Sequence, residues 1–261
     1  MPVSSLHLCN PMNRMLPITL YRLSSLVALL CSLIASADGP LRIGAEDDWY
    51  PYSAERGGKP IGMAAELVTA AYRAEGIDVQ LISLPYARCM QLALVDKLVG
   101  CFDTLRNPQL EHKYRWARTP LLHARIDIYA PVSAPDIHVS YDMLHGKRIA
   151  VTNGYEYGQP FDDDKTMLRD IADSDLFALK KLASGRVDYA LVYDRIVAAA
   201  LQEHPELRGR FKSVGTLIEP DIYISFAPHL AGVDDAIRAF DAGMAKIKAN
   251  GELQQIYTRW H

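Results

Sequence analysis

The sequence is poor in cysteine, has no excess of positive charge and contains no long hydrophobic run beyond its N-terminal region. Its four cysteines form no CxxC pair and its eight histidines are scattered, so no metal site and no cofactor are expected. The formal net charge of −3 argues against a surface that binds nucleic acid. No later stretch is apolar for long enough to span a bilayer, so the rest of the chain is expected to be soluble.

The N-terminal region has the pattern of a cleaved export signal. Arg14 and Arg22 precede the apolar run "LSSLVALLCSLIASA", which is too short for a membrane anchor. The run ends in a small-x-small pattern, Ala35–Ala37, which predicts cleavage before Asp38. Residues 1–37 are therefore interpreted as a signal peptide and the mature protein as periplasmic. The long stretch before the apolar run leaves the true start codon open.

The cysteines bear on two further questions, whether the protein carries a lipid anchor and whether it contains a disulfide. Cys31 lies inside the signal, and the bulky Leu30 before it disfavours a lipoprotein signal. Cys89 and Cys101 remain in the mature chain, in a predicted helix and in the strand that follows it. An oxidising compartment permits a disulfide between them, but buried free thiols are equally compatible with the pattern.

Strand and helix patterns alternate after residue 40. Examples are the strand "LRIGA", the helix "GMAAELVTAAYRAEG", the alternating run "IDVQLISLP" and the helix "YARCMQLALVDKL". The pattern starts again at "GKRIAVTNGYEYG" and ends in a long amphipathic helix. This order predicts an α/β fold with mostly parallel sheets, and the two similar blocks predict two lobes.

Three stretches together resemble the bacterial periplasmic solute-binding proteins of family 3, the polar amino acid type. They are "LRIGAEDDWYPYS" with "GKPIGMAAELVTAAYRAEGIDVQ", then "ALKKLASGRVDYALVYD", and finally "AIRAFDAGMAKIKANGELQQIYTRWH". The resemblance covers residues 40–261 in the right order. It implies a type II periplasmic-binding-protein fold, in which two lobes are joined by two crossing strands and the ligand binds between them at the strand ends.

The resemblance also implies domain limits and partners. The expected partner is a small polar ligand, such as an amino acid or a related compound, delivered to an inner-membrane ABC permease or to a sensor. A monomer that binds no nucleic acid is expected. The implied limits are residues 38–124 and 219–261 for lobe 1 and 125–218 for lobe 2, with crossings near Leu122–Arg125 and Gly215–Asp221.

The first candidate contacts lie in the loop after the first strand, in "LRIGAEDDWYPYS". The family places its aromatic loop at the cleft, so Asp48 and Trp49 are expected to contact the ligand. Tyr52 is expected to pack structurally instead.

The position that receives a ligand carboxylate departs from the family pattern. The family has an arginine after Thr-Pro-Glu, whereas this chain has "NPQ" followed by Leu110. Arg106 and Arg88 are the alternative cations, and each is equally well explained as a solvated charge. Tyr86, beside Arg88, and Thr104, just before this stretch, complete the lobe 1 candidates.

In lobe 2, Asp194 matches the family position that pairs with a ligand amine, although it also suits a helix cap. The stretch "TNGYEYG" resembles the family's anion loop, in which Gly154 permits the turn and Tyr155 follows it. Glu156 is unusual beside a carboxylate and suggests a cationic or non-standard ligand.

Two alternatives to a binding protein stay open. Cyclohexadienyl dehydratases share this fold, and Asp48, Glu156 and Asp194 are the carboxyls that such acid chemistry would use. An orphan periplasmic sensor with a degenerate cleft is the other alternative.

Overall fold

The computed structural model describes residues 39–135 and 138–260. The predicted signal peptide lies outside these described residues. None of the helices in the described ranges has both the length and the apolar character needed to cross a membrane.

The first sheet collects strands from both ends of the mature chain. Its order is β5-β1-β6-β14-β7, and β8 also pairs with β14. β1 runs parallel to β5 and β6, whereas β14 is antiparallel to β6, β7 and β8. The bounds are β1 Leu41–Glu46, β5 Val79–Leu84, β6 Gly100–Leu105, β7 Arg115–Trp116, β8 Leu122–His123 and β14 Asp221–Phe226.

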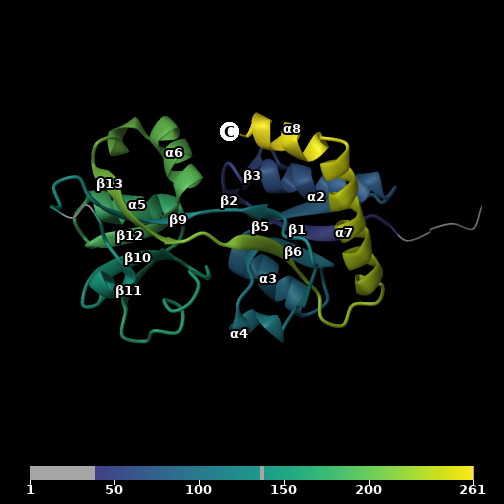
Figure 1. Ribbon diagram of the computed structural model, residues 1–261, viewed down its shortest axis with the longest axis horizontal. Coiled ribbons are helices and arrows are strands. Elements are labelled where there is room, and N and C mark those ends of the chain that lie inside the picture. Colours follow the sequence, from purple (N-terminus) through teal and green to yellow (C-terminus); the bar gives the residue numbers. More distant parts are fainter. Residues whose placement is uncertain (1–38, 136–137, 261) are drawn as a thin grey trace, which may run out of the picture. The chain divides into compact units, whose positions relative to one another are not determined.

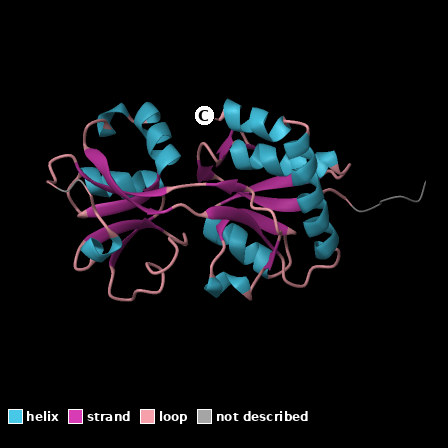
Figure 2. Cartoon of the chain, viewed as in Figure 1, coloured by secondary structure: helices cyan, strands magenta, loops and turns pink. Residues whose placement is uncertain are grey.

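Helices cover the first sheet (Figures 1 and 2). The apolar residues of α2 recur at helical spacing, and most of them are buried, among them Leu67, Val68 and Tyr72. This buried side packs on α7, which comes from the far end of the sequence. The bounds are α2 Met63–Ala74, α3 Tyr86–Leu94, α4 Pro108–Glu111, α7 Val233–Ala249 and α8 Glu252–Arg259.

The second sheet is formed by the middle of the chain. Its order is β11-β10-β12-β9-β13, with β10 parallel to β11 and β12, and β9 antiparallel to β12 and β13. The strands are β9 Ile126–Pro131, β10 Arg148–Thr152, β11 Leu168–Ala172, β12 Tyr189–Tyr193 and β13 Phe211–Ile218. The helices are α5 Asp175–Ala183 and α6 Asp194–Glu203, with short 3-10 turns at Tyr141–Leu144 and Pro205–Leu207.

The chain passes between the two sheets twice. It leaves the first sheet after β8 and enters the second at β9, and it returns from β13 to β14 through residues 219–220. The two sheets therefore define two lobes joined by two crossings. A small three-stranded sheet, β2 Asp48–Trp49, β3 Ser53–Arg56 and β4 Lys59–Ile61, follows β1 in lobe 1.

A disulfide joins Cys89 of α3 to Cys101 of β6, with the Cα atoms 5.7 Å apart. Of the two alternatives that the sequence left open, the structure has the disulfide. Gly44 of β1 makes room for it, because a Cβ at this position would lie 2.3 Å from Cys89 Sγ. The bond therefore anchors α3 against the centre of the first sheet.

Candidate ligand-binding cleft

The carboxyl ends of the parallel strands of both lobes meet at one small cavity. β1 ends at Glu46, α3 begins just after β5, and β12 ends at Tyr193. In open α/β sheets this edge is where ligands bind. The cavity measures about 10 Å³, room for about one water molecule. Its lining residues are Glu46, Trp49, Tyr86, Asp103, Tyr155, Glu156 and Tyr193.

Aromatic side chains form most of the cavity wall. Trp49 stacks on Tyr52 with ring centroids 4.2 Å apart and meets the edge of Tyr193 at 4.9 Å. Tyr155 meets Tyr86 edge to face at 5.4 Å and Tyr193 at 6.5 Å. These rings come from both lobes, so the wall is complete only when the lobes are together.

Two hydrogen bonds cross between the lobes at this cavity. The Tyr86 hydroxyl on α3 donates to Glu156 Oε2 at 2.6 Å, and the Tyr155 hydroxyl donates to Glu46 Oε1. Each bond joins a phenol from one lobe to a carboxyl from the other. The lobes are thus closed on each other through the candidate site itself.

The carboxyls at the cavity are held away from water. Burial, and then the neighbouring Asp103 carboxyl, raises the pKa of Glu46 well above its usual range. Burial also raises the pKa of Asp103 well above its usual range and that of Glu156 to about 8. Just behind them, burial raises the pKa of Asp175 to about 7. Closure therefore favours the protonated forms of these acids.

Among these four acids, Asp103 combines an unfavourable backbone conformation with a carboxyl that has no hydrogen-bond partner. Its φ is 74°, in the left-handed region, at a register shift between β6 and β14. The residue is 5% exposed, and neither carboxyl oxygen has a partner with hydrogen-bond geometry. The Ser53 hydroxyl is close enough to lower the pKa of Asp103, but it donates to the backbone carbonyl of Glu46 at 2.6 Å. Trp49 Nε1, in the same wall, is likewise buried without a partner.

Four residues predicted from the sequence line this cavity: Trp49, Tyr86, Tyr155 and Glu156. Their contact with a ligand stays a prediction. The sequence analysis missed Glu46, Asp103 and Tyr193. Glu46 and Tyr193 are the last residues of their strands, and this position was the available signal. No sequence signal marked Asp103, because its left-handed backbone occurs inside a strand at a residue that is not glycine.

The predicted arginines lie away from the cavity lining. Arg106 donates through Nε and Nη2 to Glu111, at 2.6 Å each, and lies over the rings of Trp116 and Tyr223. Arg88 is exposed on α3. Leu110 packs beside the small apolar cluster around the disulfide. The structure thus brings neither arginine to the cavity.

The remaining predicted side chains are also outside the lining. Asp194, the first residue of α6, forms an ion pair with Arg125 at 3.1 Å and accepts from the backbone N–H of Arg195. Thr104 is buried in lobe 1 and donates to Ser225 Oγ at 3.1 Å. Asp48 is exposed on β2.

The loop around Gly154 differs from the expected anion loop. Gly154 has a φ of 80°, and a Cβ there would lie 3.1 Å from the Ala87 side chain of the other lobe. Most neighbouring backbone N–H groups already donate within the protein: Asn153 to Ala172, Tyr155 to Thr152, and Tyr157 and Gly158 to Asp162. The glycine therefore serves close approach of the lobes.

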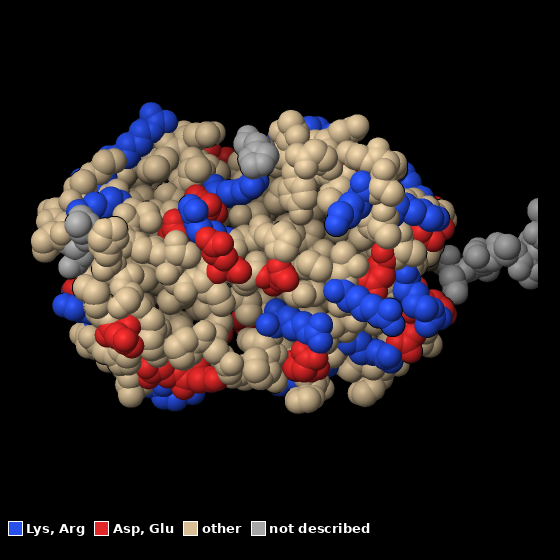
Figure 3. All heavy atoms as spheres, viewed as in Figure 1, with Lys and Arg blue, Asp and Glu red and all other residues tan. Residues whose placement is uncertain are grey.

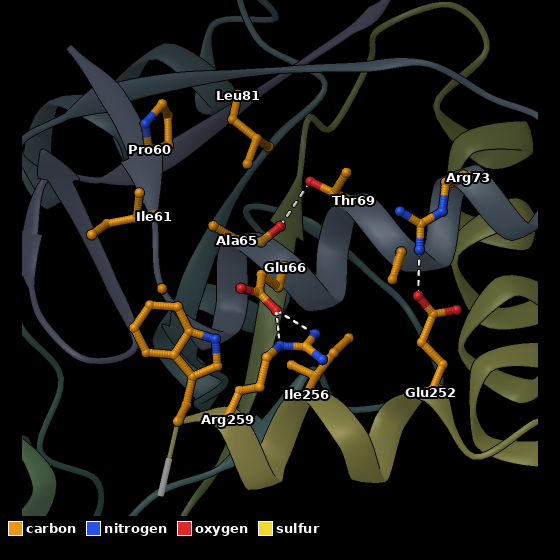
Figure 4. Close-up of a pocket in the computed structure, with 13 residues that line it drawn as sticks. Pro60, Ile61, Ala65, Glu66, Thr69, Arg73, Leu81, Glu252, Ile256 and Arg259 are labelled. Carbon is orange, nitrogen blue, oxygen red and sulfur yellow. Dashed lines mark hydrogen bonds and ion pairs between the residues drawn. The ribbon is translucent and has the colours of Figure 1, made fainter. Parts of the chain in front are cut away.

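A wider pocket of about 370 Å³ lies in lobe 1 between β4, α2 and α8 (Figure 4). Its charged side chains pair with each other, Arg259 with Glu66 and Arg73 with Glu252. On the face drawn in Figure 3, positive and negative side chains are interspersed. The charged side chains of this pocket are thus paired with each other, whereas Asp103 at the cavity between the strand ends has no hydrogen-bond partner.

Within residues 39–135 and 138–260, no group of His, Cys, Asp and Glu side chains has the arrangement of a metal site.

Comparison with known proteins identifies the family. Residues 41–261 match the model of the bacterial extracellular solute-binding proteins, family 3, and the chain belongs to this family. A comparison with curated proteins found no match.

Solved structures share the fold. An ancestral arginine-binding protein bound to arginine has a TM-score of 0.74 at 20% identity, covering 86% of this chain and 99% of its own. The arginine-, lysine-, histidine-binding protein ArtJ from Geobacillus stearothermophilus has a TM-score of 0.72 at 15% identity, with 85% and 95% covered. A histidine kinase sensor domain with similarity to periplasmic binding proteins has 0.73 at 19%, also with 85% and 95% covered. At these identities the likeness shows the fold, the type II periplasmic-binding-protein fold.

Proposed function

We propose that this protein is a periplasmic receptor that binds a small polar solute, an amino acid or a related compound, in the cleft between its lobes. Family membership supports solute binding, and the structure supports the location. The observation with the most weight is the closed cavity, whose polar groups come from both lobes and bond across it. A cavity of about 10 Å³ does not admit an amino acid, so binding requires the lobes to open and close again.

The first experiment looks for a bound solute directly. The mature protein, purified without unfolding, is denatured and the released small molecules are identified by mass spectrometry. The compounds found are then tested by thermal shift, because a ligand that binds only the folded state must raise Tm by mass action. Failure of every polar solute tested to raise Tm would contradict the proposal.

The role downstream of binding has two forms. Delivery to an inner-membrane ABC permease fits the family, and sensing fits the likeness to a kinase sensor domain. Growth on the identified solute as sole nitrogen source, with and without the gene, distinguishes them, since only uptake predicts a growth defect. We also propose that the protein acts as a monomer, with lobes divided near residues 124–125 and 218–219.

An enzymatic role is the second candidate, favoured by one observation. Burial raises the pKa of Glu156 to about 8, which would suit a general acid at neutral pH. The other two carboxyls expected for such chemistry, Asp48 and Asp194, lie outside the cavity lining. Incubation with prephenate or arogenate, followed by mass spectrometry, tests this candidate. Unchanged substrate would exclude these reactions.

A further inference from the structure

The ionisable side chains that line the cavity are all acids or phenols. Glu46, Asp103 and Glu156 contribute carboxyls, and among the described residues no Lys, Arg or His lines the cavity. Buried carboxylates are stable in proteins only when a cation or several hydrogen bonds compensate them. The cavity therefore has negative charge to offer and no positive charge.

The hydrogen bonds leave one carboxyl without compensation. Glu46 accepts from Tyr155, and Glu156 accepts from Tyr86. Asp103, 5% exposed, has both oxygens unpartnered while it lines the same cavity. A buried group of this kind points to a partner that binds there.

Two arginines that the sequence places near the cleft already have partners, and the charge of Lys113 acts on Glu156 and not on Asp103 or Glu46. Arg125 pairs with Asp127 and Asp194, each at 3.1 Å. Arg106 is held in a two-bond pair with Glu111. Compensation for Asp103 and Glu46 must therefore come from a proton or from the ligand.

The cavity also lacks a receptor for an anion. The loop after β10 uses most of its backbone N–H groups inside lobe 2, as described above. Among the described residues that line the cavity, Trp49 supplies a buried side-chain donor without a partner, its Nε1, and one neutral N–H suits a carbonyl or hydroxyl oxygen better than a full negative charge.

We propose that the cleft selects a small organic cation, an amine or a guanidine, whose positive group sits between Asp103 and Glu46, and that a carboxylate on the ligand is not required. This inference rests on the proposed function, because it names the class of solute for the same cleft. Two adjacent buried carboxyls cannot both ionise without a partner. When Asp103 and Glu46 are ionised, a ligand cation between them supplies the positive charge that a bound proton would otherwise supply, so the lobes can close.

The test uses matched probes that differ by one group. Arginine and agmatine, and lysine and cadaverine, differ only in the carboxylate, whereas citrulline replaces the guanidinium of arginine by a neutral urea. Thermal shift and calorimetry at pH 7.5 are expected to detect agmatine or cadaverine, bound at least as tightly as the parent amino acid. A ligand carboxylate would lose its hydration here without a cationic partner. Citrulline keeps one ammonium and one carboxylate and has no net positive charge, so it is expected to bind more weakly than agmatine.

Variants locate the charge. Asp103→Asn and Glu46→Gln are each expected to weaken binding of the responding amine by about 30-fold or more, the usual effect of removing one partner of a desolvated charge pair. Asn tolerates the left-handed backbone of residue 103, so this variant should fold. Asp235→Asn, the same change at an exposed site on α7, is the control and should bind normally.

The outcomes separate the inference from the proposed function. Amines that bind and lose affinity in the two cleft variants support both. Binding of amino acids but not of their decarboxylated partners, unaffected by Asp103→Asn, overturns the inference and leaves the proposed function intact. No response to any amine, amino acid or other polar solute overturns both.

Discussion

At the scale of single residues, the buried Asp103 carboxyl is expected to cost the ligand-free protein stability. Its folded-state pKa is raised, so its contribution to stability is present below the usual value of 3.8 and is lost as pH rises towards the folded pKa. Asp103→Asn removes the ionisable group. We expect the ligand-free variant to be more stable than wild type at pH 7.5 by about 1 kcal/mol or more, or about 2–4 °C in Tm.

Scanning calorimetry of both proteins at pH 5 and pH 7.5 measures this difference. The gain should be smaller at pH 5, because this pH is closer to the unfolded pKa of Asp103 and less of the cost of keeping the buried carboxyl protonated has accumulated. Asp235→Asn should stay within about 0.5 kcal/mol of wild type at both values. A variant that is no more stable than wild type at pH 7.5 would mean that Asp103 is compensated within the protein.

Part of this site could be predicted from the sequence, because several of its residues lie in the loops that follow predicted strands. Trp49 lies three residues after the end of β1, and Tyr155 and Glu156 lie three and four residues after the end of β10. Loops at strand ends are where an α/β fold gathers its polar groups. Asp194 and Arg106 also follow strand ends, yet each finds a partner inside the protein. Backbone twist and competing ion pairs decide which of two neighbouring residues faces the cavity. Neither of these two causes can be recognised as a pattern in the sequence.

At the scale of elements, the disulfide connects the two segments that hold Tyr86 and Asp103. Cys89 lies one turn after Tyr86 on α3, and Cys101 lies two residues before Asp103 on β6. Closing this loop of 12 residues restricts the unfolded chain. The double variant Cys89→Ala/Cys101→Ala should therefore lose about 2–4 kcal/mol of unfolding free energy.

Urea unfolding monitored by circular dichroism measures that loss. Wild type with a reducing agent should match the double variant, and the reducing agent should leave the variant unchanged. Equal stability of wild type and variant under oxidising conditions would mean that the bond does not form in the folded protein.

Gly44 tests the same packing from the neighbouring strand. A Cβ there would meet Cys89 Sγ at 2.3 Å and Leu98 Cδ1 at 3.0 Å; the disulfide fixes the first atom and burial restricts the second. We expect Gly44→Ala to destabilise the protein by about 1–3 kcal/mol. Gly39→Ala is the control, because no atom lies within 4 Å of its added Cβ. Equal unfolding midpoints for the two variants would contradict this account of the close approach.

The α/β fold class predicted from the sequence is confirmed, and the strongly periodic elements appear where expected. β11 and β13 were not predicted. β11 is an edge strand with Leu168 and Ile171 exposed, so it lacks the alternation of a half-buried strand. β13 contains Gly215 and two register shifts, which interrupt its pattern. Both strands are specified mainly by their neighbours in the sheet, which a local pattern does not report.

At the scale of the whole molecule, the two lobes are held together by contacts of different strength. Arg56 and Glu203 form an ion pair between lobes at 2.6 Å, but both side chains are about half exposed. Such pairs are usually worth about 0–1 kcal/mol and weaken with salt. The desolvated acids at the cavity act in the opposite direction and are not screened by solvent. Protonation of these acids should therefore control ligand-free closure more strongly than salt does.

The sign of the pH dependence follows from the raised pKa values. In the closed structure burial raises the pKa of Asp175 to about 7 and that of Glu156 to about 8, and it raises those of Glu46 and Asp103 well above their usual values. The closed state therefore binds more protons than an open state with solvated acids. Its advantage is present at acidic pH and is lost as pH rises through about 7 and 8.

We therefore expect the ligand-free lobes to open between pH 5 and pH 8, and a bound amine to close them again at pH 8. Small-angle scattering of the mature protein should show a larger radius of gyration at pH 8 than at pH 5. Saturating agmatine or cadaverine, whichever binds, should restore the smaller radius, because its positive charge replaces the lost protons. The variant with both Asp103→Asn and Glu46→Gln should change less with pH, since two of the titrating groups are removed. A radius that is the same at both pH values, or larger at pH 5, would show that proton uptake by these carboxyls does not drive closure.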